Sequence, residues 1–272
     1  GVTLEPGAAL LSCWLTQDPW TNFRLTVVLP PAAPHGPSLV LRRCPPVRSN
    51  LELLANQGWL PGAATEYLEQ CLAARARLAV VGTDELDRAV FLSALLTSID
   101  EHTRVVAVQD QPLLSIPQPD KVELLAAPND TPGSASLAAL VRIAPGLRPD
   151  LVVVRDCRGS EAFEVFELTP RGVPHWLLAA YALDARDLTD RLETMLLMHH
   201  DAHSPTALRA QIGRELDVVV TVRRDQAGAP RVVELAEVHG VQDGRVAVSV
   251  TWELDPRHGE LVHTGAHSQF GG

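Results

Sequence analysis

The chain has 272 residues, of which 46% are hydrophobic, so it can bury a full core without disulfide or metal staples. Its formal net charge of −10 argues against a nucleic-acid-binding surface, because such surfaces need clustered Lys and Arg to neutralise phosphates. No window approaches the ~20 uninterrupted apolar residues of a membrane span, and the N-terminus lacks the basic and apolar regions of a signal peptide. We therefore expect a cytoplasmic protein, with Cys13, Cys44, Cys71 and Cys157 reduced because they lack CxxC spacing.

The first part of the chain has the pattern of short strands. Apolar and polar residues alternate at 9–15 and 24–29, and a turn-rich stretch then leads into 38–43. We expect residues 1–48 to form a small N-terminal β module, the remnant of a larger domain together with its linker.

The pattern changes to helix from Pro61, which suits a first helical turn, and Ala64, Leu68, Cys71 and Leu72 then fall on one face. Beyond this helix, short apolar runs alternate with helical segments, which is typical of an α/β sheet buried on both faces. The expected strands are 78–81, 105–108, 122–125, 151–154 and 177–180, and further helices are expected at 185–198 and 205–214.

The pattern changes again near the end, where 218–222, 231–238 and 245–254 are expected to be consecutive antiparallel strands. Asp243-Gly244 predicts a hairpin turn between the last two. We therefore place one large domain at 49–254. Residues 255–272 show no periodicity and are expected to be a flexible tail.

The segment 77–99 has the frame of a phosphate-binding strand, loop and helix. A working loop of the form G-x-x-x-x-G-K-[ST] uses glycines so that backbone N–H groups can surround phosphate, a Lys for the β- and γ-phosphates, and a hydroxyl for Mg²⁺. The residues here are Gly82, Thr83, Asp84, Glu85, Leu86, Asp87, Arg88 and Ala89. We expect an exposed loop and helix start whose three carboxylates repel phosphate.

Three strings around this frame carry a family resemblance: the linker FRLTVVLPPAAPHGPSLVLRR, the strand LRPDLVVVRDCRGSEAFE and the helix ARDLTDRLETMLLM. Together they resemble the ATPases of type II and type IV secretion and pilus assembly, especially the CpaF-type branch, from about Phe23 to about Val250. The resemblance implies a RecA-like P-loop-NTPase-type core. It also implies hexameric rings, with ATP and Mg²⁺ in the active members.

The resemblance also assigns the family's catalytic positions. The Walker A Lys falls on Arg88 and the following hydroxyl on Ala89. In the acidic box, Gln109 and Leu113 stand where the family has Glu, and only Asp110 remains acidic. All of these changes weaken phosphate grip, metal binding or water activation.

The other two motifs are altered as well. The Walker B Gly-Glu falls on Arg155-Asp156, and the two expected histidines of the histidine box fall on Val173 and Tyr181. His175 lies two residues out of register. Phosphoryl transfer depends almost entirely on positioning and electrostatic stabilisation, so we expect no catalytic residue, bound nucleotide or metal here.

The resulting hypothesis is a catalytically inactive homologue of a secretion or pilus ATPase that acts as a structural or regulatory subunit. Its expected partners are secretion or pilus machinery proteins or an active paralogue, with possible self-assembly, at the periphery of an inner-membrane secretion complex. One alternative is a slow ATPase that binds Mg²⁺-ATP through Arg88, Asp110 and Asp156. Another is a sensor of a small ligand, such as a cyclic dinucleotide, in the old cleft.

Several polar residues admit both a structural and a functional interpretation. Asp110 and Asp156 are interpreted as inherited carboxylates at strand ends rather than metal ligands. Arg158 and Glu161 are interpreted as a local charge pair. His199 and His203 have zinc-compatible spacing but are interpreted as a solvated helix end. The tail histidines are expected to be exposed, namely His258, His263 and His267.

Arg42 and Arg43 belong to the linker strand. In the resembling family such arginines reach toward nucleotide between the two domains. Here they are expected to bridge the two domains or to pair with Asp84, Glu85 or Asp87, whose carboxylates supply the charge that phosphate once did. The alternative is a relic nucleotide contact.

Overall fold

The computed structural model describes residues 10–18, 21–43, 49–126, 135–199, 204–255 and 257–270. Its first three strands, β1 (Leu10–Asp18), β2 (Thr21–Val28) and β3 (Ser38–Arg43), form an antiparallel sheet in the order β1-β2-β3. The predicted N-terminal β module is therefore confirmed as a sheet of its own. Where this module ends and the large domain begins stays a prediction.

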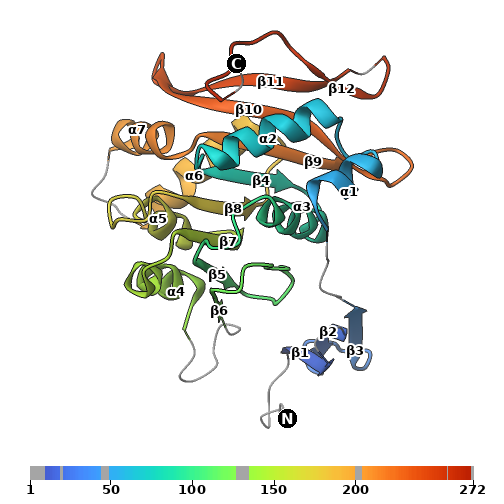
Figure 1. Cartoon of the computed structure of the whole chain (residues 1–272). Helices are drawn as coiled ribbons and strands as arrows, with labels where there is room; N and C mark the ends of the chain where they lie inside the picture. Colours follow the sequence, from blue (N-terminus) through green and yellow to red (C-terminus); the bar gives the residue numbers. More distant parts are fainter. Residues whose placement is uncertain are drawn as a thin grey trace.

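The other strands form one nine-stranded sheet in the order β12-β11-β10-β9-β4-β8-β7-β5-β6 (Figure 1). The strands are β4 (Leu78–Gly82), β5 (Val105–Gln109), β6 (Lys121–Leu125), β7 (Leu151–Cys157), β8 (Trp176–Ala180), β9 (Val218–Arg224), β10 (Pro230–Gln242), β11 (Arg245–Asp255) and β12 (Glu260–His263). Strands β4 to β9 are parallel, and β10 to β12 add an antiparallel extension. The predicted α/β class with C-terminal antiparallel strands is confirmed.

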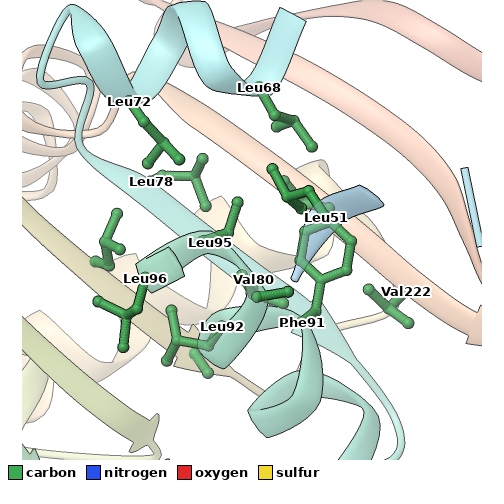
Figure 2. Close-up of a cluster of buried hydrophobic side chains, with 14 of the residues drawn as sticks. Leu51, Leu68, Leu72, Leu78, Val80, Phe91, Leu92, Leu95, Leu96 and Val222 are labelled. Atoms are coloured by element: carbon green, nitrogen blue, oxygen red, sulfur yellow. The ribbon is translucent and has the colours of Figure 1, made fainter. Parts of the chain in front are cut away.

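Helices cover both faces of the parallel region. They are α1 (Leu51–Asn56), α2 (Gly62–Ala73), α3 (Glu85–Thr97), α4 (Leu137–Ile143), α5 (Glu161–Phe166), α6 (Ala185–His199) and α7 (Pro205–Glu215), with a 3₁₀ turn at Ala144–Leu147. Successive strand residues point to opposite faces, so Leu78 and Val80 join the cluster under α1 to α3, while Ala79 and Val81 join the cluster under α4 to α7. Figure 2 shows the first cluster, with Leu68 of α2 and Phe91 of α3 packed over β4.

Local sequence explains where several elements begin. The extended backbone of Pro61 precedes α2, and the predicted inner face of α2 is buried. Ser204 caps α7 by accepting a hydrogen bond from the Ala207 N–H, with Pro205 in the first turn. Asp243 and Gly244 both have positive φ in the predicted hairpin turn between β10 and β11. No helix in the described ranges has the length and apolar character needed to cross a membrane.

The end of the chain differs from the prediction. Residues 260–263 form β12, which pairs antiparallel with β11, so the expected flexible tail was wrong for this segment. The Thr264 hydroxyl continues the connection by donating to the Val250 carbonyl over 2.7 Å. Short strands of this kind carry little periodicity, because four residues give only two positions on each face.

Candidate functional site

The six parallel strands β4 to β9 end at one edge of the sheet, and the loop 82–89, Asp110 and Asp156 gather there because they lie at strand ends. The loop 82–89 joins β4 to α3, and Asp84 is the N-cap of that helix. The Asp84 carboxylate accepts hydrogen bonds from the Leu86 N–H at 2.9 Å and the Asp87 N–H at 3.1 Å. These helix N-terminal donors are the groups that would otherwise bind a phosphate. A carboxylate of the chain itself has taken them.

The Arg88 side chain is turned inward. Its guanidinium donates to the Gly82 carbonyl and to the Asp156 carboxylate, both over 2.6 Å. Only 3% of Arg88 and 5% of Asp87 are exposed, and Ala89 is buried as well. The expectation of an exposed loop and helix start was therefore wrong for these three residues, because ion pairing draws the two charged residues into the interior.

Asp87 pairs with an arginine from the end of β9. Both carboxylate oxygens of Asp87 lie 2.7 Å from Arg224 nitrogens. A carboxylate oxygen of Asp84 lies 3.8 Å from the Arg224 Nε. Burial raises the pKa of Asp87, and the Arg224 guanidinium opposes that rise. Bidentate pairs of this kind fix geometry as well as charge, so Arg224 ties β9 to the start of α3.

Two further arginines complete the network. The buried Arg155 donates to Glu85 at 2.9 Å and to Asp110 at 2.7 Å, while burial lowers its pKa. Arg158 donates to Asp156 and lies 3.6 Å from Glu85. The ion-pair cluster thus consists of Asp84, Glu85, Asp87, Arg88, Asp110, Arg155, Asp156, Arg158 and Arg224.

Asp156 is the most deeply buried carboxylate of this cluster. It lies where the register of β7 against β8 shifts, and its φ of 65° lies in the left-handed region. Burial alone would raise the pKa of Asp156, but Arg158 and Arg88 hold that pKa below its usual range. Asp156 and Asp110 are therefore ion-paired within the chain, and the interpretation that they bind no metal stays a prediction.

The predicted charge pair between Arg158 and Glu161 is not formed as expected. Glu161 instead accepts from the backbone N–H groups of Arg158 and Gly159, the second at 2.9 Å. The Arg158 guanidinium turns instead to the buried carboxylate of Asp156.

The acidic-box positions have become part of the packing. Gln109 is fully buried, and its side-chain amide donates to Glu123 and accepts from the Leu114 N–H, each at 3.3 Å. Leu113 belongs to the hydrophobic cluster under α1 to α3. A buried amide with two partners and an aliphatic side chain offer no group that could activate a water molecule.

The histidine-box positions are also apolar or displaced. Val173 is buried in the other hydrophobic cluster, while Tyr181 is exposed and its ring lies 4.8 Å from the guanidinium carbon of Arg191. His175 is 4% exposed, and its Nε2 has no hydrogen-bond partner among the described residues. Burial, and then the charge of Arg75, lower the pKa of His175 to about 4.

This lowered pKa predicts a pH dependence of stability. His175 stays neutral in the folded protein down to pH about 4, whereas an unfolded His binds a proton near pH 6.5. The free energy of unfolding should therefore be nearly constant above pH about 6.5. It should fall by about 2 kcal/mol between pH 7.5 and pH 5, because the unfolded state then binds a proton that the folded state does not. Urea unfolding at the two pH values measures the difference, and His175→Gln should remove most of it. An unchanged slope in the variant would assign the pH dependence to other groups.

Some predictions fall outside the described structure. The strand position of Arg42 and Arg43 is confirmed, but their side chains, the His199 side chain and all of His203 lie outside the described residues. The three carboxylates assigned to the linker arginines contact Arg155, Arg158 and Arg224, and their pairing with Arg42 or Arg43 stays a prediction. The three tail histidines His258, His263 and His267 are exposed as expected. Among the described residues, no group of three or more His, Cys, Asp or Glu is arranged to hold a metal ion.

The residues present do not fit a Mg²⁺-nucleotide. The helix N–H donors and Arg88 are occupied by carboxylates, and Ala89 gives Mg²⁺ no oxygen. The sequence did not reveal Arg224, whose partner Asp87 is 137 residues away. The one feature of the sequence that pointed to such a partner was the excess of acidic residues in the loop 82–89, because these carboxylates require cations from other parts of the chain.

Comparison with known proteins gives consistent matches. The profile described as "Type II/IV secretion system protein" matches residues 15–269. A putative conjugal transfer protein of Mycobacterium tuberculosis is 30% identical over 234 residues, which are 85% of this chain and 66% of that relative. The type IV secretion system protein PtlH of Bordetella pertussis is 25% identical over 78% of this chain and 71% of its own length. The chain thus spans about two thirds of the length of these relatives.

Solved structures share the fold. The VirB11 ATPase of the Brucella suis type IV secretion system, in complex with sulphate, has a TM-score of 0.58 and 21% identity, covering 86% of this chain and 77% of that one. The pilus retraction motor PilT with bound ADP has a TM-score of 0.60 and 16% identity, covering 84% of this chain and 62% of that one. At these identities the likeness establishes the arrangement of the elements.

Proposed function

This chain belongs to the type II/IV secretion system protein family, and we propose that it is a catalytically inactive member that acts through protein contacts. The proposal has two parts. The first is that the inherited nucleotide site neither binds nor hydrolyses nucleotide. The second is that the retained fold serves as a structural or regulatory subunit of a secretion or pilus-assembly machine.

One observation carries the first part: the chain's own carboxylates occupy the groups that would grip phosphate. Asp84 accepts from the N–H groups at the start of α3, and Asp156 holds the guanidinium that replaces the Walker A Lys. A phosphate would have to break these charge-assisted bonds and then face Glu85 and Asp87. Each such bond is worth roughly 1.5–3 kcal/mol, so the internal partners outcompete a weakly held ligand.

We predict no detectable binding of ATP or GTP at millimolar Mg²⁺-nucleotide. Titration calorimetry and thermal unfolding with and without nucleotide measure this directly. A nucleotide that bound would stabilise the fold by about 2.7 kcal/mol at a hundredfold excess over its dissociation constant. Because we expect no binding, the unfolding temperature should stay unchanged. A micromolar dissociation constant would contradict the proposal. Turnover abolished by Asp156→Ala would show a slow ATPase instead.

The second part rests on family membership and on the intact core. The nine-stranded sheet has a buried hydrophobic cluster on each of its faces, so surfaces for neighbouring proteins can persist without the reaction. Affinity purification of the full-length protein from its own cells should recover secretion or pilus proteins or a paralogue with intact Walker motifs. Purified protein that binds neither such a paralogue nor itself in ultracentrifugation would contradict this part.

A further inference from the structure

The C-terminal end of the described chain lies beside the antiparallel strands of the large sheet (Figure 1). Its Gln269 N–H donates to the carboxylate of Glu237. Glu237 on β10 is 0% exposed. Its oxygens accept hydrogen bonds from the Tyr67 hydroxyl at 2.8 Å and from the Gln269 N–H at 2.9 Å, and also from the Ser268 hydroxyl. One carboxylate therefore joins α2 to the end of the chain.

Among the side chains that the structure describes, no Lys, Arg or His forms an ion pair with Glu237. A buried carboxylate without a cation depends on hydrogen-bond donors, and each donor that is lost leaves an expensive unpaired acceptor. Two of the three donors come from residues 268 and 269. Loss of this segment would therefore leave the buried Glu237 oxygens without two of their three donors.

The same segment has apolar and backbone anchors. Thr264 bonds to the carbonyls of Val250 and Thr251 in β11, and Phe270 packs against the hydrophobic cluster that contains Leu51 of α1. That cluster also contains Cys71 of α2. We call residues 264–270 the C-terminal strap.

We propose that the C-terminal strap is a conformational latch, which holds the α1–α2 pair against the large sheet and can open as a unit. The α1–α2 pair is the first part of the large-sheet region in chain order after the N-terminal sheet. Opening the strap would leave Glu237 with Tyr67 as its remaining donor and would remove the Phe270 contact. Helix α2 would then be held less firmly, while the opposite face of the sheet keeps its packing.

Two cysteines report on the two faces. Cys71 lies in the cluster under α1 to α3, and Cys157 lies in the cluster under α4 to α7, and both are buried free thiols. Iodoacetamide labelling followed by peptide mass spectrometry measures both rates in one sample. The strap variant is Ser268→Ala with Gln269→Pro, which removes one hydroxyl and one N–H donor. His267→Ala is the matched control, because His267 is an exposed residue of the same segment.

The strap variant should accelerate labelling of Cys71 at least about tenfold, which corresponds to about 1.4 kcal/mol, and leave Cys157 unchanged. The control should change neither rate. Unchanged Cys71 labelling, or equal acceleration of both cysteines, would overturn the proposal, because the first shows no latch and the second shows global unfolding.

A second measurement keeps the proposal testable if the double substitution prevents folding. In that case Ser268→Ala alone is compared by hydrogen exchange, in which the amides of α2 should lose protection and those of α6 should not. Glu237→Gln adds a further check, because an amide keeps one oxygen acceptor, and a lost donor costs a neutral amide less than it costs a carboxylate. Ser268→Ala should therefore have a smaller effect on α2 exchange in the Glu237→Gln background. An effect of equal size in both backgrounds would overturn the role assigned to Glu237.

Discussion

Asp156→Asn should lower the free energy of unfolding by about 3–5 kcal/mol, which is the usual cost of leaving one partner of a buried ion pair without the other. The Arg88 guanidinium lies 2.6 Å from this carboxylate, and both side chains are almost fully buried. Asn keeps the size of the side chain and tolerates the positive φ at this position. The decrease in the free energy of unfolding therefore measures the effect of removing the negative charge. Urea unfolding followed by circular dichroism at pH 7.5 measures it.

Two comparisons sharpen this prediction. Arg158→Gln removes the half-exposed partner of the same carboxylate and should cost below about 1 kcal/mol. Arg88→Met combined with Asp156→Asn should recover at least half of the loss, since no buried charge is then left unpaired. A double variant no more stable than Asp156→Asn alone would show that packing, rather than charge pairing, explains the effect.

The loss should also depend on pH in a defined direction. Because Arg158 and Arg88 hold the pKa of Asp156 below its usual range against the effect of burial, the carboxylate stabilises the fold above its unfolded pKa of about 3.9. That contribution disappears as pH falls through the lower, folded pKa. The stability difference between the wild type and Asp156→Asn should therefore shrink below pH about 4.

Restoring the Walker A residues alone should fail to restore nucleotide binding. The variant with Leu86→Ser, Asp87→Gly, Arg88→Lys and Ala89→Thr still contains Asp84, whose carboxylate occupies the N–H groups at the start of α3. Adding Asp84→Ala frees those donors at a cost of about 1 kcal/mol for the lost cap. Two freed donors at roughly 1.5–3 kcal/mol each should raise ATP affinity about 10²–10⁴-fold over the fourfold variant.

Titration calorimetry compares the fourfold and fivefold variants, and circular dichroism checks that both are folded, because Asp87→Gly also removes the pair with Arg224. Turnover should stay at background in both, since Gln109 and Leu113 supply no base and Val173 and Tyr181 no sensing histidine. Equal affinity in the two variants would contradict the role of Asp84 as the internal occupant of the phosphate site.

The sequence alone predicted the elements whose patterns are local. Apolar runs such as Leu78–Val81 and Leu151–Val154 predicted buried parallel strands, because side chains on both faces of such strands are apolar. The residues of the loop 82–89 predicted a site without the Lys and hydroxyl that hold phosphate and Mg²⁺. This prediction is also local, because the pattern it uses spans only eight consecutive residues. The same holds for the hairpin turn at Asp243-Gly244.

Tertiary structure decided which charges meet and where the chain end binds. The strand order β9-β4-β8-β7-β5 differs from chain order, and it brings Arg224, Arg155 and Arg158 to the loop of β4. No periodicity encodes such a meeting, because it depends on which strand ends are neighbours in the sheet. The same reason applies to Glu237, whose donors come from α2 and from the chain end, 170 and 32 residues away. Local pattern therefore specified the elements, while long-range packing specified which charges meet at the β4 loop and which donors reach Glu237.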